Sequence, residues 1–394
     1  QVVADQAATC FEGYEALDHA SCVQALVVNG EPASTAKAGD AVQVVLDTTP
    51  FYGEGGGQVG DRGVLAGSDL IVRIESVSRS RDVFVHAGRV ERGELALGDT
   101  VKAQVDRACR RRAQANHTAT HLLQAALKQV VDPGIGQAGS LVDFDRLRFD
   151  FHCPTAVTAD QLQQVETLIN GWINEAHALQ VQEMAIDQAK AAGAVAMFGE
   201  KYADVVRVVD VPGVSMELCG GTHVANTAEI GLFKIVAESG VAAGIRRIEA
   251  VAGPAVLAYL NERDAVVKQL GDRFKAQPAE IVDRVAALQE ELKATGKALA
   301  AAQAELAVAK AGALAAKAEA VGDFQLLVER LDGVDGAGLQ GAAQSLADQL
   351  GDGAAVVIGG LPDPGDMGKV ILVAAFGKQA VSYTHLTLPT STHG

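Results

Sequence analysis

The sequence has few aromatic residues and few cysteines, and both shortages limit what the chain can be. Aromatic residues make up 4% of the 394 residues, so any core must be built mainly from Ala, Val, Leu and Ile. The five cysteines are an odd number in a long chain, which argues against a disulfide framework and favours a reducing, cytoplasmic environment. They are Cys10, Cys22, Cys109, Cys153 and Cys219.

Positive charge is also scarce. Acidic residues outnumber basic ones by 49 to 33, which gives a formal net charge of −16. This argues against a simple basic nucleic-acid binder but leaves room for a local basic site on an acidic body. No run approaches the ~18 consecutive apolar residues of a membrane span. Because Gln1 is not an initiator residue, we expect the chain to be part of a longer protein.

The hydrophobic content of 48% is ample for packed cores, and the length predicts several domains. Residues 1–22 are expected to form a helical tail or linker, because Phe11, Tyr14 and Leu17 lie at near-helical spacing. Residues 23–105 contain short β-branched runs between turn residues, which predicts a small antiparallel β-barrel. The expected strands are Val23–Val28, Val42–Leu46, Leu70–Val77, Val83–Ala87 and Val101–Val105.

Residues 106–253 mix helical and strand patterns and predict an α+β core. Helices are expected at 106–132 and 159–179, and a short one near 187–198. The expected strands are Ser140–Phe144, Leu147–Phe151, 180–186, 205–209, 231–237 and 246–251. The fold class is therefore α+β and multidomain.

Residues 254–320 carry a heptad pattern typical of a helical hairpin or coiled coil. A first helix is followed by a second that begins at Pro278, in which Leu292, Leu299 and Leu306 recur every seven residues. We interpret the pair as an antiparallel spacer or dimerisation arm.

Residues 321–381 predict a small α/β domain, with a helix at Leu339–Leu350 and strands at Val356–Ile358 and Val370–Ala375. Residues 382–394 abruptly become Thr-rich and polar, and we interpret them as a vector-derived or assembly-derived tail.

Two short motifs together supply a complete ligand set for zinc. His117 and His121 are four residues apart on the helix expected at 106–132, so their side chains project from one face. Cys219 and His223 have the same spacing in a Gly-rich turn. Three imidazoles and one thiolate match tetrahedral zinc, which is either structural or catalytic. A metalloprotease is disfavoured because Thr118 occupies the position of the zincin glutamate.

These motifs belong to a larger set that resembles the alanyl-tRNA synthetase family, in the portion after the aminoacylation and tRNA-recognition domains. The set comprises Thr49–Asp61, His117–His121, Gly136–Phe151, Cys219–His223 and Gly244–Ala250, in that order. On residues alone, the glycine-rich stretch at Thr49–Asp61 would be interpreted as a mobile hairpin loop. The resemblance covers residues 1–381.

The resemblance implies a proofreading hydrolase that cleaves serine or glycine from wrongly charged tRNA(Ala). It implies that the whole enzyme joins alanine to its tRNA with ATP, which binds in a domain before Gln1. Residues 254–320 and 321–381 would bind tRNA and support a homodimer, the latter as a truncated domain. The implied catalytic set is Gln58, His117, His121, Cys219 and His223, of which the last four would bind one zinc ion.

Contacts to the 3′ end of the tRNA are expected from a few polar and basic side chains, namely Gln58, Arg148, Arg246, Arg247 and Thr222. For the arginines, salt bridging to Asp150 and Glu249 is an equally good interpretation. Two other functions stay open. One is a free-standing deacylase that edits in trans, and the other is a zinc-stabilised tRNA-binding module without catalysis.

Overall fold

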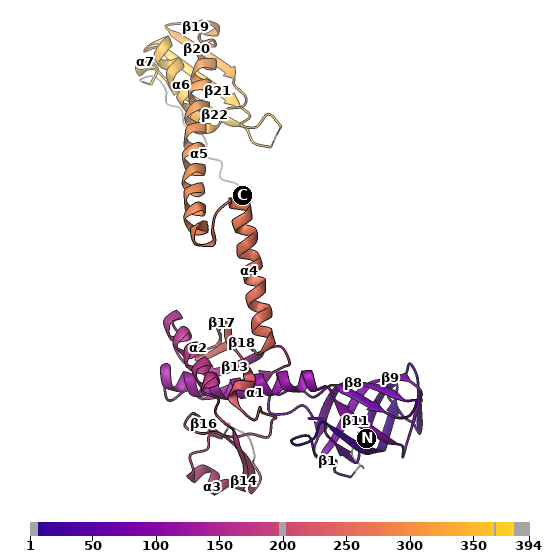
Figure 1. Cartoon of the computed structure of the whole chain (residues 1–394). Helices are drawn as coiled ribbons and strands as arrows, with labels where there is room; N and C mark the ends of the chain where they lie inside the picture. The colour runs from indigo at the N-terminus through magenta and orange to yellow at the C-terminus, as the bar shows by residue number, and fades with distance from the viewer. Residues whose placement is uncertain (1–6, 197–201, 366–367, 382–394) are drawn as a thin grey trace. The chain divides into compact units, whose positions relative to one another are not determined.

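The computed structural model describes residues 7–196, 202–365 and 368–381, so the polar tail at 382–394 lies outside the described residues. The chain divides into two compact units, residues 1–265 and 266–394. The first unit holds a β-barrel and an α+β core, and the second holds most of the helical segment and a small α/β domain (Figure 1).

Six antiparallel strands form the closed barrel that the sequence predicts. Each strand pairs with the next in the order β2, β5, β9, β8, β7 and β11, and β11 pairs back with β2. Their alternating side chains fill the core, in which Val44, Leu65 and Val72 are fully buried. The strands are β2 (Asp18–Val28), β5 (Ala41–Leu46), β7 (Gly63–Ala66), β8 (Ile71–Ser80), β9 (Val83–Arg92) and β11 (Thr100–Val105).

Short strands accompany the barrel. One of them shows that the helix expected within residues 1–22 is absent from the described part of that segment. The described part of residues 1–22 forms strands, not a helix, because Cys10 and Phe11 pair with Thr48 and Thr49 and the chain then enters β2. Phe11 and Leu17 pack against the barrel core, so their helix-like spacing reflects tertiary packing. The short strands are β1 (Cys10–Phe11), β3 (Glu31–Pro32), β4 (Thr35–Lys37), β6 (Thr48–Thr49) and β10 (Glu94–Ala96).

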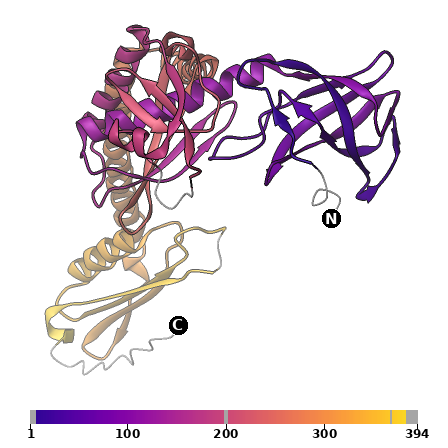
Figure 2. The same ribbon diagram turned by 90° about the horizontal axis from the view of Figure 1, so that it is seen from below.

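The α+β core is built on helix α1 (Arg107–Val130), which begins directly after the barrel (Figure 2). The Asp106 side chain accepts hydrogen bonds from the first free amides of the helix and so fixes its start. α1 packs against α2 (Ala159–Asn174) and against an antiparallel sheet, with Leu122, Leu123 and Phe149 fully buried between them. The sheet order is β12 (Gln137–Val142), β13 (Leu147–His152), β18 (Ile245–Ala252) and β17 (Phe233–Ala242).

A second, three-stranded sheet carries the cysteine motif. Its order is β14 (Gln180–Ala185), β15 (Val205–Val211) and β16 (Ser215–Leu218), and α3 (Ile186–Ala191) packs against β14 and β15. A 3₁₀ turn at Thr227–Ile230 contacts α1 and α2. Two predicted helices end early. α2 stops before residue 179 because Ala176 adopts a left-handed φ of 59°, and α3 stops before Gly193, whose φ is 92°. Residues 197 and 198, the end of the helix predicted near 187–198, lie outside the described residues.

The two helices of the heptad region are α4 (Pro254–Phe274) and α5 (Ile281–Gly312), separated by a 3₁₀ turn at Pro278–Glu280. Leu292, Leu299 and Leu306 of α5 are 75%, 58% and 55% exposed, so the pairing of this seam stays a prediction. Contrary to the sequence analysis, Pro278–Lys317 is long and apolar enough, by length and composition, to cross a membrane; it is the single such helix among the described residues. The apolar 18-residue window of this helix is rich in alanine, and one such helix is weak evidence of a membrane span.

The small α/β domain of the second unit has the predicted helix and strands plus two strands that were missed. β20 and β21 pair in parallel, and α6 packs on the sheet together with Ala307 and Ala311 of α5. The sheet order is β19 (Glu319–Val321), β20 (Phe324–Arg330), β21 (Ala354–Gly360) and β22 (Ile371–Phe376), with α6 (Gly336–Leu350), α7 (Lys378–Val381) and a 3₁₀ turn at Ala315–Lys317.

Candidate metal centre

The four predicted ligands come together in the first unit. His117 and His121 project from one face of α1, and Cys219 and His223 lie in the turn that follows β16. One potential ligand atom from each lies within 4.8 Å of all the others. The Cys219 Sγ atom is 3.4 Å from His117 Nε2 and 3.3 Å from His223 Nε2. These four side chains could hold a metal ion, and imidazole and thiolate are both ligands that zinc accepts.

The histidines are held in the neutral form that a metal requires. Burial lowers the pKa of His117 and His223 well below 6.5 and lowers the pKa of His121 to about 4. Neutral imidazoles keep a nitrogen lone pair available near neutral pH, so no proton competes with a cation.

Hydrogen bonds orient two of the three rings. His117 Nδ1 donates to Gln58 Oε1 at 2.7 Å, and His223 Nδ1 donates to Thr118 Oγ1 at 3.1 Å. The Thr118 hydroxyl in turn donates to the Gln114 carbonyl. Both rings therefore present Nε2 to the thiolate, the arrangement expected where outer partners fix the tautomer of a metal ligand.

His121 completes the set in a different way. Its Nδ1 atom is buried and has no hydrogen-bond partner within the described residues. Its Nε2 atom lies 3.7 Å from the carboxylate of Glu217, whose pKa burial raises to about 8. A buried nitrogen without a partner fits a metal ligand, so the residues present fit zinc. Sequence reasoning missed Glu217, although it lies two positions before Cys219.

The predicted site residue Gln58 reaches the centre from the barrel side. Gln58 is fully buried, its Oε1 accepts from Thr222 N at 3.0 Å, and its Nε2 donates to Thr222 Oγ1 at 2.9 Å. The backbone before it turns through Gly57, whose φ is 82° and where a Cβ would lie 2.5 Å from Ser140 Oγ. The glycine-rich stretch turns back on itself between Gly55 and Gln58, as the hairpin interpretation predicts, and Gly57 and Gln58 anchor it against the core.

The two glycines of the cysteine turn have different surroundings. A Cβ on Gly221 would lie 2.1 Å from Cε1 and 2.4 Å from Nδ1 of His117. A Cβ on Gly220 would meet nothing within 4 Å. Glycine at 221 is therefore needed for the close approach of the turn to the His117 ring.

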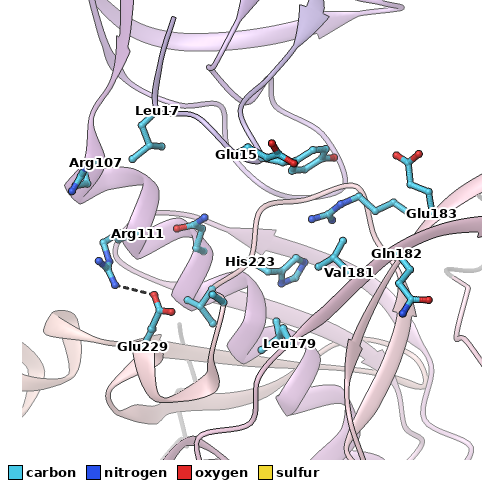
Figure 3. Close-up of a pocket in the computed structure, with 15 residues that line it drawn as sticks. Glu15, Leu17, Arg107, Arg111, Leu179, Val181, Gln182, Glu183, His223 and Glu229 are labelled. Atoms are coloured by element: carbon cyan, nitrogen blue, oxygen red, sulfur yellow. Dashed lines mark hydrogen bonds and ion pairs between the residues drawn. The ribbon is translucent and has the colours of Figure 1, made fainter.

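Cavities lie on two sides of the centre. One of about 230 Å³ is lined by His117, His121, Cys219 and the barrel residues Tyr52 and Gly53, among others. A second, of about 630 Å³, borders His223 and is lined mainly by charged and polar side chains (Figure 3). Within it Arg111 forms an ion pair with Glu229 at 2.9 Å. Three of the four potential ligands thus line the smaller cavity.

The predicted tRNA-contacting arginines lie on the sheet of β12, β13, β17 and β18. Arg247 forms two hydrogen bonds to Asp150, and Arg148 lies 3.7 Å from the same carboxylate. Arg246 binds Glu238 rather than Glu249. The salt-bridge interpretation is thus confirmed for Asp150, and a contact of these arginines with tRNA stays a prediction.

Two family models match the chain. The model described as tRNA synthetases class II (A) matches residues 1–109, whose described part forms the barrel and the start of α1. The model described as the threonyl and alanyl tRNA synthetase second additional domain matches residues 206–249, which include Cys219 and His223. The two matches therefore place the barrel and the turn that carries Cys219 and His223 in a class II tRNA synthetase.

Relatives identify the family more closely. Over 382 residues the chain is 97% identical to alanine–tRNA ligase of Synechococcus sp. (strain CC9605) and 90% identical to that of Parasynechococcus marenigrum (strain WH8102). Each match covers 97% of this chain and 43% of the relative. The chain belongs to the alanine–tRNA ligase family and spans less than half the length of these relatives.

Proposed function

We propose that this chain is the proofreading part of an alanine–tRNA ligase and hydrolyses serine or glycine wrongly esterified to tRNA(Ala). The observation that carries the proposal is the convergence of His117, His121, Cys219 and His223 beside a cavity that three of them line. Gln58 is buried behind this cavity and acts through its hydrogen bond to His117, which lines it. The whole enzyme would charge tRNA(Ala) with alanine, using ATP.

The four ligands would hold one zinc ion. When bound, zinc supplies positive charge beside the ester, which orients the substrate or polarises the attacking water. The chain's own residues position the ligands around the cavity. Gln58 fixes the His117 ring and the Thr222 backbone, so the side of the cavity that faces the ester is set before substrate arrives. Because four protein ligands fill a tetrahedral shell, orienting the substrate is the role that this set favours.

Selectivity follows from the difference between the amino acids. Serine has one hydroxyl more than alanine, and an apolar synthetic pocket rejects such an addition only weakly. The 230 Å³ cavity is lined in part by polar groups, including Ser140 and Gln137. A hydrolytic site that can hydrogen-bond the extra hydroxyl corrects the error.

We further propose that tRNA(Ala) is the macromolecular partner, bound through its aminoacylated 3′ end at the centre. The heptad helices and the α/β domain at 321–381 would add tRNA contacts and a homodimer interface. The expected location is the cytoplasm.

The test is deacylation of seryl-tRNA(Ala) by the purified chain. We expect release of serine by the parent and by Cys10→Ala, which changes an exposed thiol outside the centre, and none by the Cys219→Ala, His223→Ala double variant. Equal rates for the parent and the double variant would overturn the proposal. Zinc-dependent tRNA binding without ester cleavage would instead identify a binding module.

A further inference from the structure

Three successive carbonyl groups of the cysteine turn accept hydrogen bonds from two side chains outside it. Arg207 Nη1 donates to the Cys219 carbonyl at 2.8 Å and to the Gly221 carbonyl at 2.9 Å. The Tyr14 hydroxyl donates to the carbonyl between them, that of Gly220, at 2.6 Å. The outer side of the turn is thus held at every peptide from Cys219 to Thr222.

The two side chains also hold each other. The Arg207 guanidinium carbon lies 4.1 Å from the centroid of the Tyr14 ring, within the range of a cation–π contact. Arg207 comes from β15 and Tyr14 from the segment between β1 and β2, 206 residues before Gly220. Both line the 630 Å³ cavity that borders His223. A residue from the barrel side, Tyr14, therefore helps to hold the outer face of the cysteine turn.

Two of the three outer bonds fix a peptide whose N–H group contacts the centre. In a planar trans peptide the C=O and N–H bonds point in opposite directions, so fixing the carbonyl fixes the amide of the next residue. The plane held by Tyr14 at Gly220 carries Gly221 N, which donates to Cys219 Sγ at 3.4 Å. The plane held by Arg207 at Gly221 carries Thr222 N, which donates to Gln58 Oε1.

The turn needs this support because its own residues supply little stiffness. Gly220 and Gly221 have no Cβ, so their backbone dihedrals are weakly restricted. Without the outer bonds, the peptide planes that bring an amide to the thiolate and another to Gln58 would be free to rotate.

We propose that Tyr14 and Arg207 are positioning residues that orient the Cys219–His223 turn for metal binding. The inference rests on the proposed metal centre and assigns to it two residues outside its ligand set. Loss of either outer bond loosens the ligand geometry, and such losses around metal sites typically lower affinity by about 10- to 100-fold.

The test compares Co²⁺ and Zn²⁺ binding by the full chain with Tyr14→Phe and Arg207→Lys. Tyr14→Phe removes one hydroxyl and keeps the ring over Arg207. The matched controls are Tyr259→Phe and Arg263→Lys, which alter a tyrosine–arginine contact of 4.8 Å on α4 away from the site. Affinity is measured by competition with a chromogenic chelator, and geometry by the thiolate-to-Co²⁺ absorption band.

We expect about 10-fold or greater weakening and an altered Co²⁺ spectrum for both site variants, with parent values for both controls. Parent-like affinity and spectrum in folded Tyr14→Phe would overturn the positioning role, even if Arg207→Lys failed to fold. A purely structural role predicts weaker folding with an unchanged Co²⁺ spectrum, which would also overturn it. A parent chain that binds neither ion would overturn the metal centre itself, so the two failures are distinguishable.

Discussion

Gln58 and His117 meet across 59 positions of sequence, with 2.7 Å between Gln58 Oε1 and His117 Nδ1. The same oxygen accepts the amide of Thr222, so one side chain from the barrel contacts both halves of the metal centre. The geometry of the metal centre therefore depends on the barrel side as well as on the α+β core. Gln58 is the first residue to test.

Replacing Gln58 with alanine should weaken zinc binding by about 10- to 100-fold, because the His117 ring loses its outer acceptor and the buried Thr222 amide loses its partner. The matched control is Gln43→Ala, an exposed glutamine on barrel strand β5. Zinc affinity by chelator competition is the measurement. Equal affinity in the two variants would show that Gln58 does not orient the ring.

The two glycines of the turn offer a comparison within one motif. Gly221→Ala should abolish tight zinc binding, because its Cβ would overlap the His117 ring at 2.1 Å. Gly220→Ala adds the same methyl group where nothing lies within 4 Å and should bind zinc as the parent does. Zinc content after dialysis distinguishes them. A Gly221→Ala protein that retains full zinc would show that the turn can move away from His117.

The ligands could be predicted from sequence because their signal is local. His117 and His121 share a helix face, and Cys219 and His223 repeat the spacing with matching donor chemistry. The barrel was recognisable from its short strands and turns. Tyr14 carried no such signal, since its role depends on a carbonyl 206 residues away. The segment before β2 was misassigned for the same reason: long-range pairing overrode a helix-like spacing.

A buried ion pair joins the barrel to α1 and was likewise invisible to local patterns. Arg110 contacts the carboxylate of Asp61, and both side chains are only 1% exposed. Arg110 also donates to the carbonyls of Gly13 and Pro50. These bonds fix the end of the glycine-rich stretch two helical turns before His117.

Arg110→Met should lower the free energy of unfolding by about 3–5 kcal/mol, since it leaves a buried carboxylate without its partner. Arg73→Met removes the exposed Arg73–Glu91 pair and should cost about 0.2–1 kcal/mol. Urea unfolding of both variants is the measurement. A loss below about 1 kcal/mol for Arg110→Met would show that the Asp61 carboxylate does not depend on this partner.

Metal removal should destabilise the parent through mass action. Zinc that binds only the folded chain adds about 4 kcal/mol at a free concentration of 1,000 times its dissociation constant. We expect a chelator to lower the melting temperature of the parent and of Cys10→Ala, and to leave that of the Cys219→Ala, His223→Ala variant unchanged. A chelator shift of parent size in the double variant would place the stabilising metal elsewhere.

His86 makes the stability of the barrel depend on pH. The ring is fully buried on β9, with Nδ1 3.0 Å from the Val44 carbonyl and Nε2 2.7 Å from Thr49 Oγ1. The carbonyl can only accept, so Nδ1 carries the proton and Nε2 accepts the Thr49 hydroxyl. Burial lowers the pKa of His86 from 6.5 to about 4. The folded chain therefore holds this ring neutral across a range in which the unfolded chain protonates it.

The sign follows from proton uptake. Between pH 6.5 and 4 the unfolded state binds a proton that the folded state does not, so the contribution is complete above pH 6.5 and is lost as the pH falls toward 4. The free energy of unfolding falls by about 3 kcal/mol, because each pKa unit between 6.5 and about 4 corresponds to about 1.36 kcal/mol.

Urea unfolding at pH 7.5 and 4.5 should show a smaller drop in the free energy of unfolding for His86→Gln than for the parent. His152→Gln, at an exposed histidine of β13, should keep the parent's drop because it leaves the barrel ring in place. The buried histidines of the metal centre affect the pH dependence of all three proteins equally. An identical drop in the free energy of unfolding for His86→Gln and the parent would therefore show that His86 is protonated in the folded barrel.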